Sequence, residues 1–175
     1  NEIATEVWNA LMEKGADLGV TPVGLGARDT LRLEKGYLLS GQDFLWPGLG
    51  HDHQGPLPAG YLSRTSLEAN IPFGLNLDHS FIGKDAMIGS GDTNTLWMGL
   101  MCTGKGPSPR TGHEVHSSPV GDSLIGLVTS GAPSPSLGVG IGMAYMENVT
   151  EGDTVYIKTS PRRIIEAEVK APPFV

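Results

Sequence analysis

Two arginines, Arg28 and Arg32, lie one helical turn apart in a stretch of helical character and therefore share one face of the predicted helix. A guanidinium can stack on a planar, electron-rich ring and donate a fork of hydrogen bonds to it. Asp29 and Glu34 lie close enough in the sequence to pair with these arginines instead, and structural ion pairs outnumber binding sites. The two arginines therefore belong either to a ligand site or to a structural network of ion pairs.

A third arginine, Arg110, stands in a turn between two predicted strands, with Pro107 and Pro109 before it. Proline restricts the backbone of the turn, so the arginine side chain can reach out of its own domain in a fixed direction. The alternative is an exposed charge on a surface loop. The sequence leaves both interpretations open for Arg110.

His51, Asp52 and His53 are residue types that bind metal ions, but they lie in a loop rich in glycine and proline. No further histidine or cysteine stands at the spacing of a known metal-binding motif. A solvated loop explains the run better than a metal site, and we predict no bound metal.

The sequence shows no clear catalytic nucleophile. Cys102 is the last residue of an apolar run, which favours a small buried hydrophobic side chain over a reactive thiol. Ser130, Ser134 and Ser136 follow a predicted strand, but the G-x-S-x-G turn of serine hydrolases is absent. A serine hydrolase is therefore excluded.

The first helix is predicted over residues 5–18, because Val7, Trp8 and Leu11 fall on one helical face. A linker containing Thr21 and Pro22 follows it. These patterns predict a helix with one apolar stripe, followed by a break before the arginine pair.

The second helix carries the arginine pair. It is predicted to begin near Gly24 or Gly26, to run to about Lys35 and to end at Gly36, a residue type that often closes helices. Leu25, Leu31 and Leu33 are expected to supply its apolar contacts.

The middle of the chain has little periodicity. Residues 42–64 are rich in Gly, Pro and His and predict a long surface loop. A short helical turn at 66–69, a strand around 73–77 and a short helix at 83–88 are expected beyond it.

The last part of the chain has a different pattern, with short apolar runs separated by Gly- and Pro-rich turns. This pattern is typical of a small antiparallel barrel or sandwich. The predicted strands span residues 96–102, 123–129, 139–146, 154–158 and 164–169. We therefore expect an α+β fold, with an α/β part over residues 1–91 followed by a small antiparallel β-barrel over residues 92–175.

Composition narrows the functional class. The chain has 175 residues, a formal net charge of -7 and a single cysteine. An acidic chain of this kind is not expected to bind nucleic acid, and no apolar run is long enough to cross a membrane. One cysteine allows no intrachain disulfide and is compatible with a reducing compartment, so we expect a cytoplasmic protein.

Several segments together resemble the glycine-cleavage T-protein (aminomethyltransferase) family. The most extensive is G-L-G-A-R-D-T-L-R-L-E-K-G at residues 24–36, and V-T-S-G at 128–131 and S-P-S-L-G at 134–138 also match. Segments 41–43, 66–69, 81–84 and 173–175 complete the series in the order of the family. Each motif alone is weak, but together they extend over almost the whole chain.

The resemblance implies a tetrahydrofolate-dependent enzyme. T-protein takes an aminomethyl group from the lipoyl arm of its partner, the lipoylated H-protein, releases ammonia and forms methylene-tetrahydrofolate. By the resemblance, Arg28 contacts the pterin and Arg110 orients the catalytic aspartate from across the cleft. Asp43 resembles a structurally important acid after the helix, and Glu68 is expected to anchor its turn.

The chain departs from the family pattern in ways that keep other members open. The catalytic aspartate and a pterin-binding glutamate of the family would lie upstream of Asn1, so the resemblance implies a C-terminal portion that is inactive alone. Ser40 stands where many members carry tyrosine, and the connection 44–64 is long. The alternatives are a folate-binding module of a sarcosine or dimethylglycine dehydrogenase or a demethylase, or a non-catalytic paralogue.

Overall fold

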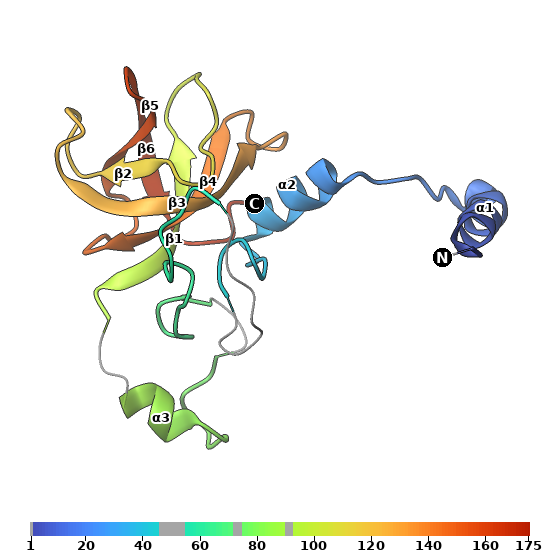
Figure 1. The fold of residues 1–175 in the computed structure, drawn as a ribbon, viewed down its shortest axis with the longest axis horizontal. Helices are drawn as coiled ribbons and strands as arrows, with labels where there is room; N and C mark the ends of the chain where they lie inside the picture. Colours follow the sequence, from blue (N-terminus) through green and yellow to red (C-terminus); the bar gives the residue numbers. More distant parts are fainter. Residues whose placement is uncertain (1, 46–54, 72–74, 90–92) are drawn as a thin grey trace.

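The computed structural model describes residues 2–45, 55–71, 75–89 and 93–175, and it places a closed β-barrel after a helical arm (Figure 1). The helices are α1 (Ala4–Gly15), a 3-10 turn (Ala16–Leu18), α2 (Leu25–Lys35) and α3 (Lys84–Gly89). The strands are β1 (Thr95–Cys102), β2 (Glu114–His116), β3 (Leu124–Pro133), β4 (Gly140–Glu147), β5 (Thr154–Ser160) and β6 (Arg163–Lys170).

The strands close into a barrel in the order β1-β4-β3-β2-β5-β6, and each neighbouring pair is antiparallel. Closure gives each of the six strands two paired neighbours, in contrast to the edge strands of an open sheet. The expected fold class, α+β with a C-terminal antiparallel barrel, is therefore confirmed. Each strand predicted within residues 92–175 is present, but the sequence pattern missed β2, which is too short to show an alternation of its own.

Alternate residues of the strands fill the barrel interior. This core consists of Met98, Leu100, Val115, Val128, Ala144, Met146, Val155, Ile157, Ala167 and Val169. Side chains of a strand alternate between two faces, so their neighbours in β1 and β4 point outward. Those outward side chains are buried as well, which shows that other parts of the chain cover this side of the barrel.

The cover of the outer face is built around α2. Leu33 of α2 is fully buried and packs in one cluster with Trp97, Ile141, Met143 and Tyr145. The two other leucines expected to pack from this helix do not: Leu25 is 80% exposed and Leu31 is 63% exposed. Only one residue of the helix makes the apolar contact because the neighbouring buried positions carry charged side chains.

Gly36 ends α2, as predicted, with a φ of 75°. Its N–H donates to the Leu33 carbonyl and the Tyr37 N–H donates to the Arg32 carbonyl, a Schellman arrangement. A Cβ atom at Gly36 would lie 2.2 Å from Pro172, so the C-terminal segment also passes close by. Both the backbone conformation and this contact require glycine.

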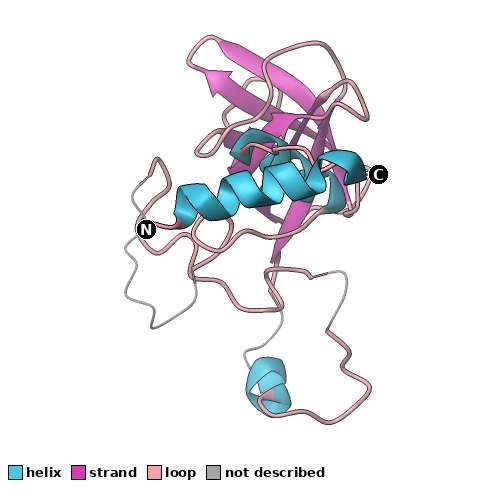
Figure 2. Cartoon of the chain, turned by 90° about the vertical axis from the view of Figure 1, so that its right-hand side faces the viewer, coloured by secondary structure: helices cyan, strands magenta, loops and turns pink. Residues whose placement is uncertain are grey.

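The α1 helix lies apart from the barrel at the end of an extended linker (Figure 1). In Figure 2 it runs across the view in front of the barrel. The predicted apolar stripe is present but faces solvent, with Val7 52%, Trp8 53% and Leu11 62% exposed. Helical periodicity thus predicted the helix correctly but could not show whether anything covers its apolar face.

Other expectations for the middle of the chain had mixed outcomes. The short helix expected at 83–88 is α3. Residues 66–69 form a turn, whereas Leu75 and Leu77 are not in a strand, so the strand expected there is wrong in its described part. Among the described helices, none has the length and apolar character needed to cross a membrane.

Candidate functional site

Asp43 is the centre of a buried polar cluster where the turn after α2 meets β3. Its carboxylate is fully buried and accepts hydrogen bonds from the Leu39 N–H (2.9 Å), the Thr129 hydroxyl (2.5 Å) and the Ser130 hydroxyl (2.6 Å). The guanidinium of Arg32 donates to the same carboxylate and forms an ion pair with it. A buried charge is tolerated only when it is paired and hydrogen-bonded, and this carboxylate meets both conditions.

Arg32 spreads its remaining hydrogen bonds over the same cluster. Nη2 donates to the Ser130 hydroxyl at 2.7 Å, Nη1 to the Tyr37 carbonyl at 3.1 Å, and Nε to Asp29 at 2.7 Å. The side chain is only 9% exposed. Of the two interpretations of the arginine pair, the structural network therefore describes Arg32.

Thr129 and Ser130 reach the same carboxylate because β3 is irregular there. In a regular strand, two successive side chains point to opposite faces. The register between β3 and β4 shifts between Val128 and Ser130, which marks a β-bulge at Thr129. The bulge turns both hydroxyls toward Asp43, and the Trp97 indole N–H donates to the Thr129 hydroxyl at 3.2 Å.

A second buried carboxylate, Glu34, ties the end of α2 to the loop between β3 and β4. It accepts hydrogen bonds from the Ser134 hydroxyl, the Ser136 N–H (3.1 Å) and the Ser136 hydroxyl (2.9 Å). The hydrogen bond from Ser134, supported by those from Ser136, lowers the pKa of Glu34. Glu34 therefore stays ionised and holds the loop against the helix.

Arg28, the predicted pterin-binding residue, is exposed on α2. Together with Val23, Leu31 and Tyr37 it lines an open hollow of about 330 Å³. The pattern predicted that Arg28 and Arg32 share a face, and both line this hollow. Arg32 is nevertheless buried against the barrel, whereas Arg28 lies toward solvent.

Arg110, the predicted orienting residue, is exposed in the turn before β2. Its Nη1 atom donates to the Gly131 carbonyl at 2.7 Å, and its backbone N–H donates to Nδ1 of His113 at 3.1 Å. Burial and the nearby Arg110 charge lower the pKa of His113. A neutral imidazole can accept the Arg110 N–H, so at neutral pH the turn is held by this hydrogen bond and by the one from the Arg110 side chain to Gly131.

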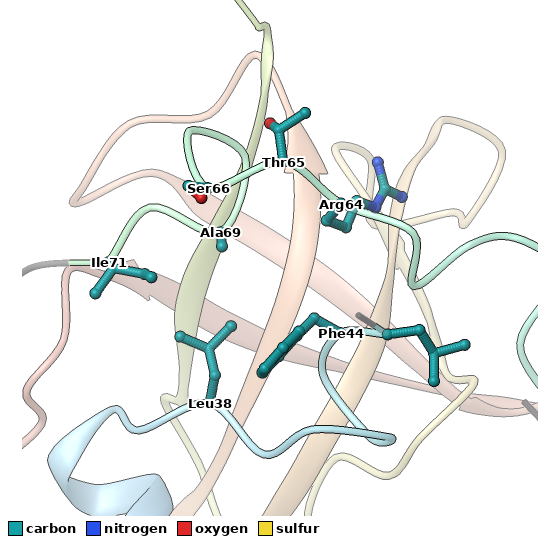
Figure 3. Close-up of a pocket in the computed structure, with 8 residues that line it drawn as sticks. Leu38, Phe44, Arg64, Thr65, Ser66, Ala69 and Ile71 are labelled. Carbon is teal, nitrogen blue, oxygen red and sulfur yellow. The ribbon is translucent and has the colours of Figure 1, made fainter. Parts of the chain in front are cut away.

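A more enclosed pocket of about 350 Å³ opens beside the Asp43 cluster (Figure 3). Figure 3 shows Leu38 and Phe44 facing Ala69 and Ile71 across it. Its lining is mainly apolar and consists of Leu38, Phe44, Leu45, Arg64, Thr65, Ser66, Ala69 and Ile71. The pocket could hold an apolar group, with one arginine at its edge.

That arginine, Arg64, is held by several contacts. Its guanidinium lies 4.6 Å from the ring centre of Tyr61 and 4.5 Å from that of Tyr145, and it pairs with Glu68 at 2.9 Å. Glu68 also accepts the Thr65 N–H, while its own N–H donates to the Thr65 hydroxyl. This reciprocal pair is a capping box, and it anchors the turn as the resemblance implied.

Two other sequence candidates are placed as follows. Cys102 is 4% exposed, and burial raises the pKa of its thiol to about 11, which fits the expected hydrophobic side chain and not a nucleophile. The run 51–53 lies outside the described residues. Within the described part of the chain, no group of three or more His, Cys, Asp or Glu side chains could hold a metal ion.

The sequence did not reveal the partners of the two buried carboxylates. Thr129, Ser130, Ser134 and Ser136 belong to the motifs that carry the family resemblance, and the three serines are also weighed as nucleophiles, but the sequence does not pair any of them with Asp43 or Glu34. One signal was available: small polar residues interrupt an otherwise apolar strand, and acidic residues lie in the last turn of a distant helix and in the segment after it. Their partnership depends on the fold, since 98 positions separate Arg32 from Ser130.

Two family models match the chain, one over the region that contains α1 and α2 and one over the barrel. Residues 1–46 match the family model of the GCVT N-terminal domain, and residues 97–175 match that of the glycine cleavage T-protein C-terminal barrel domain.

An aminomethyltransferase of Halothermothrix orenii is 42% identical over 175 residues, covering 97% of this chain and 43% of that protein. A probable aminomethyltransferase of Halobacterium salinarum is 37% identical, covering 98% of this chain and 42% of that protein.

A crystal structure of the glycine cleavage system aminomethyltransferase T from Bartonella henselae shows the same fold, with a TM-score of 0.70 at 28% identity. The match covers 97% of this chain and 44% of that one, so the chain spans less than half the length of these relatives. The order of its domains, the relatives and the fold together show that this chain belongs to the glycine cleavage T-protein family of aminomethyltransferases.

Proposed function

We propose that the full-length protein is a tetrahydrofolate-dependent aminomethyltransferase of the glycine cleavage system. It takes the aminomethyl carbon from the lipoyl arm of H-protein, transfers it to tetrahydrofolate and releases ammonia. The observation that carries this proposal is the 42% identity to an aminomethyltransferase over 97% of the chain, which includes both the helix of Arg28 and the barrel. A cytoplasmic location, and domain limits at residues 1–91 and 92–175, are parts of the same proposal.

The hollow beside Arg28 has features that suit a folate ring. Leu31 and Val23 expose apolar surface there, and Arg28 and Lys35 add positive charge. A guanidinium at the edge of apolar surface can stack on a planar ring and donate hydrogen bonds to its heteroatoms. When bound, tetrahydrofolate supplies the nitrogen atoms that accept the one-carbon unit, and Arg28 would hold the ring in place.

Arg110 is proposed to hold the catalytic carboxylate of the family, which the resemblance places upstream of this chain. A guanidinium can bind both oxygens of a carboxylate in one geometry. The hydrogen bond from Nη1 to Gly131 limits the directions in which the side chain can point. This fixed orientation supports a role in placing a reacting group rather than in attracting a ligand.

The proposal is tested by folate binding to the full-length protein and its Arg28→Ala variant. Loss of a charge-assisted contact should weaken binding by about 1.5–3 kcal/mol, measured by isothermal titration with tetrahydrofolate. Arg162→Ala is a matched control, since Arg162 is also an exposed arginine but lies in the turn between β5 and β6. Equal folate affinity in the wild type and both variants would disprove the proposal that Arg28 binds folate.

The identity of the one-carbon donor needs a separate assay. Ser40, at a position where many family members carry tyrosine, keeps a related folate enzyme as the second candidate. Transfer from aminomethylated, lipoylated H-protein to tetrahydrofolate, with release of ammonia, is expected for an aminomethyltransferase. Folate binding without this transfer would favour the folate module of a dehydrogenase or demethylase.

A further inference from the structure

Residues 129–131 of β3 lie between the helix of Arg28 and the turn of Arg110. We call these three residues the 129–131 segment. Its side chains contact the α2 side of the structure, and two of its carbonyl groups contact the Arg110 side. The segment therefore touches the supports of both proposed functional arginines.

The carbonyl side of the segment is covered by the Arg110 turn. β2 is short and pairs with β3 only as far as Leu127, so the edge of β3 beyond it needs other partners. The Gly112 N–H donates to the Val128 carbonyl at 2.8 Å, and the Thr111 hydroxyl donates to the Thr129 carbonyl at 2.8 Å. The Arg110 side chain continues the series at Gly131, so the turn takes the place of β2 along this edge.

Gly131 allows the chain before the turn to lie directly on the strand. A Cβ atom at this position would lie 2.2 Å from the Pro109 carbonyl oxygen. Backbone atoms cannot give way by that amount, so a side chain here would push Pro109 and the following Arg110 away from β3. The segment thus sets how closely the turn approaches the barrel.

The side-chain side of the segment is held by the Asp43 cluster. Because of the bulge at Thr129, both Thr129 and Ser130 donate to Asp43. Ser130 also accepts from Arg32, which lies one turn after Arg28 on α2. A shift of the segment would therefore move the helix of Arg28 relative to the turn of Arg110.

We propose that the 129–131 segment is a positioning element for the one-carbon transfer: it fixes the α2 helix and the Arg110 turn in one relative placement. This inference rests on the function proposed above. The segment would affect the reaction only through positioning, because a small displacement of an orienting group lowers the rate of transfer much more than it lowers substrate affinity. No residue of the segment needs to touch the substrate.

The kinetic test uses Thr111→Val in the full-length protein. This change removes the hydroxyl that donates to Thr129 and keeps the shape of the side chain. We expect turnover to fall about 10-fold or more while the KM for tetrahydrofolate changes less than about 2-fold. Thr111→Ser, which keeps the hydroxyl, should restore most of the turnover.

Thr103→Val is the matched control. The Thr103 hydroxyl donates to Glu166 at 3.0 Å on another part of the barrel and has no contact with the segment in the described structure. It should leave turnover within about 2-fold of the wild type, as expected for an exposed hydrogen bond outside the site. Normal turnover in Thr111→Val, or equal loss in the control, would overturn the inference.

A second measurement does not depend on activity. Ser130→Ala removes a hydroxyl on the α2 side, and hydrogen exchange is then followed at the Gly112 amide on the opposite side. If the segment couples the two sides, exchange at Gly112 should become about 10-fold faster in Ser130→Ala and stay unchanged in Thr103→Val. Unchanged exchange in Ser130→Ala would contradict the coupling.

The activities of the wild type and of Thr111→Val separate the failure of the inference from the failure of the proposed function. A wild-type protein that transfers no aminomethyl group to tetrahydrofolate disproves the function, and the positioning role falls with it. An active wild type with an unaffected Thr111→Val variant disproves only the positioning role.

Discussion

Replacement of Asp43 by asparagine should destabilise the protein far more than the same change at Asp29. Both carboxylates pair with Arg32, but Asp43 is fully buried and the side chain of Asp29 is 31% exposed. The two variants therefore compare one chemical change at two degrees of burial, with the same partner.

The magnitude follows from what Asp43→Asn leaves behind. Arg32 remains 9% exposed, and its only other carboxylate partner in the described structure is Asp29. Removal of one member of a buried ion pair costs about 3–5 kcal/mol, because the remaining charge is uncompensated. The new amide also brings donors to a place where Thr129 and Ser130 already donate, so hydrogen bonds are lost as well.

Asp29→Asn should have a much smaller effect. Partly exposed ion pairs contribute about 0–1 kcal/mol, since water replaces the lost partner. A domain is stable by about 5–15 kcal/mol, so the Asp43 variant should lose about a fifth or more of its stability and the Asp29 variant very little.

The assay is urea unfolding, followed by circular dichroism and tryptophan fluorescence. Trp97, one of three tryptophans in the chain, donates to Thr129 inside the cluster, so part of the emission reports on this region. If the two variants differ in free energy of unfolding by less than about 1 kcal/mol, the ion pair of Asp43 does not behave as a buried one and the reasoning is refuted.

Three further predictions concern other residues. The hydrogen bond from Ser134 lowers the pKa of Glu34 below its usual 4.5, so the contribution of ionised Glu34 to stability is complete above pH 4.5 and is lost as the pH falls through the lowered value. The Tm difference between wild type and Glu34→Gln should therefore be largest at neutral pH and shrink in acid. A Tm difference that stays constant with pH would argue against this role. Cys102, with a pKa of about 11, should react with a thiol reagent at pH 8 only after unfolding, and fast labelling of the native protein would show that it is accessible. Arg110→Lys in the full-length protein should lower turnover more than it weakens folate binding and should leave the Tm nearly unchanged, because lysine keeps the charge and loses the planar fork; normal turnover would return Arg110 to the role of a loop charge.

A structural feature can be predicted from the sequence when its signal lies within a few consecutive residues. Gly36 was predicted to end α2, and it does, because a left-handed backbone at a helix end is a property of a few consecutive residues. The long barrel strands were predicted for the same reason, since apolar runs between Gly- and Pro-rich turns are visible within each segment. Helical periodicity predicted α1, and the glycines at both ends predicted the position of α2.

The same local signals could not predict which faces are covered. Leu25, Leu31 and Leu33 looked equivalent as apolar residues of one helix, yet only Leu33 meets the barrel. Burial depends on which neighbour the fold brings to each face, and that neighbour is far away in the sequence.

The amino-acid sequence by itself determined the class of this protein: the order of its motifs carried the family resemblance, and its turn and strand patterns predicted a small antiparallel barrel or sandwich. Only the tertiary structure decided the roles of Arg32, Asp43 and Ser130. The hydrogen bonds of Ser130 to Asp43 and Arg32 join residues 87 and 98 positions apart, and they form only after the barrel has closed and α2 has packed on its outer face. The bulge at Thr129 adds a further condition, because one extra residue in β3 reverses the direction of a side chain without leaving a distinct mark in the sequence.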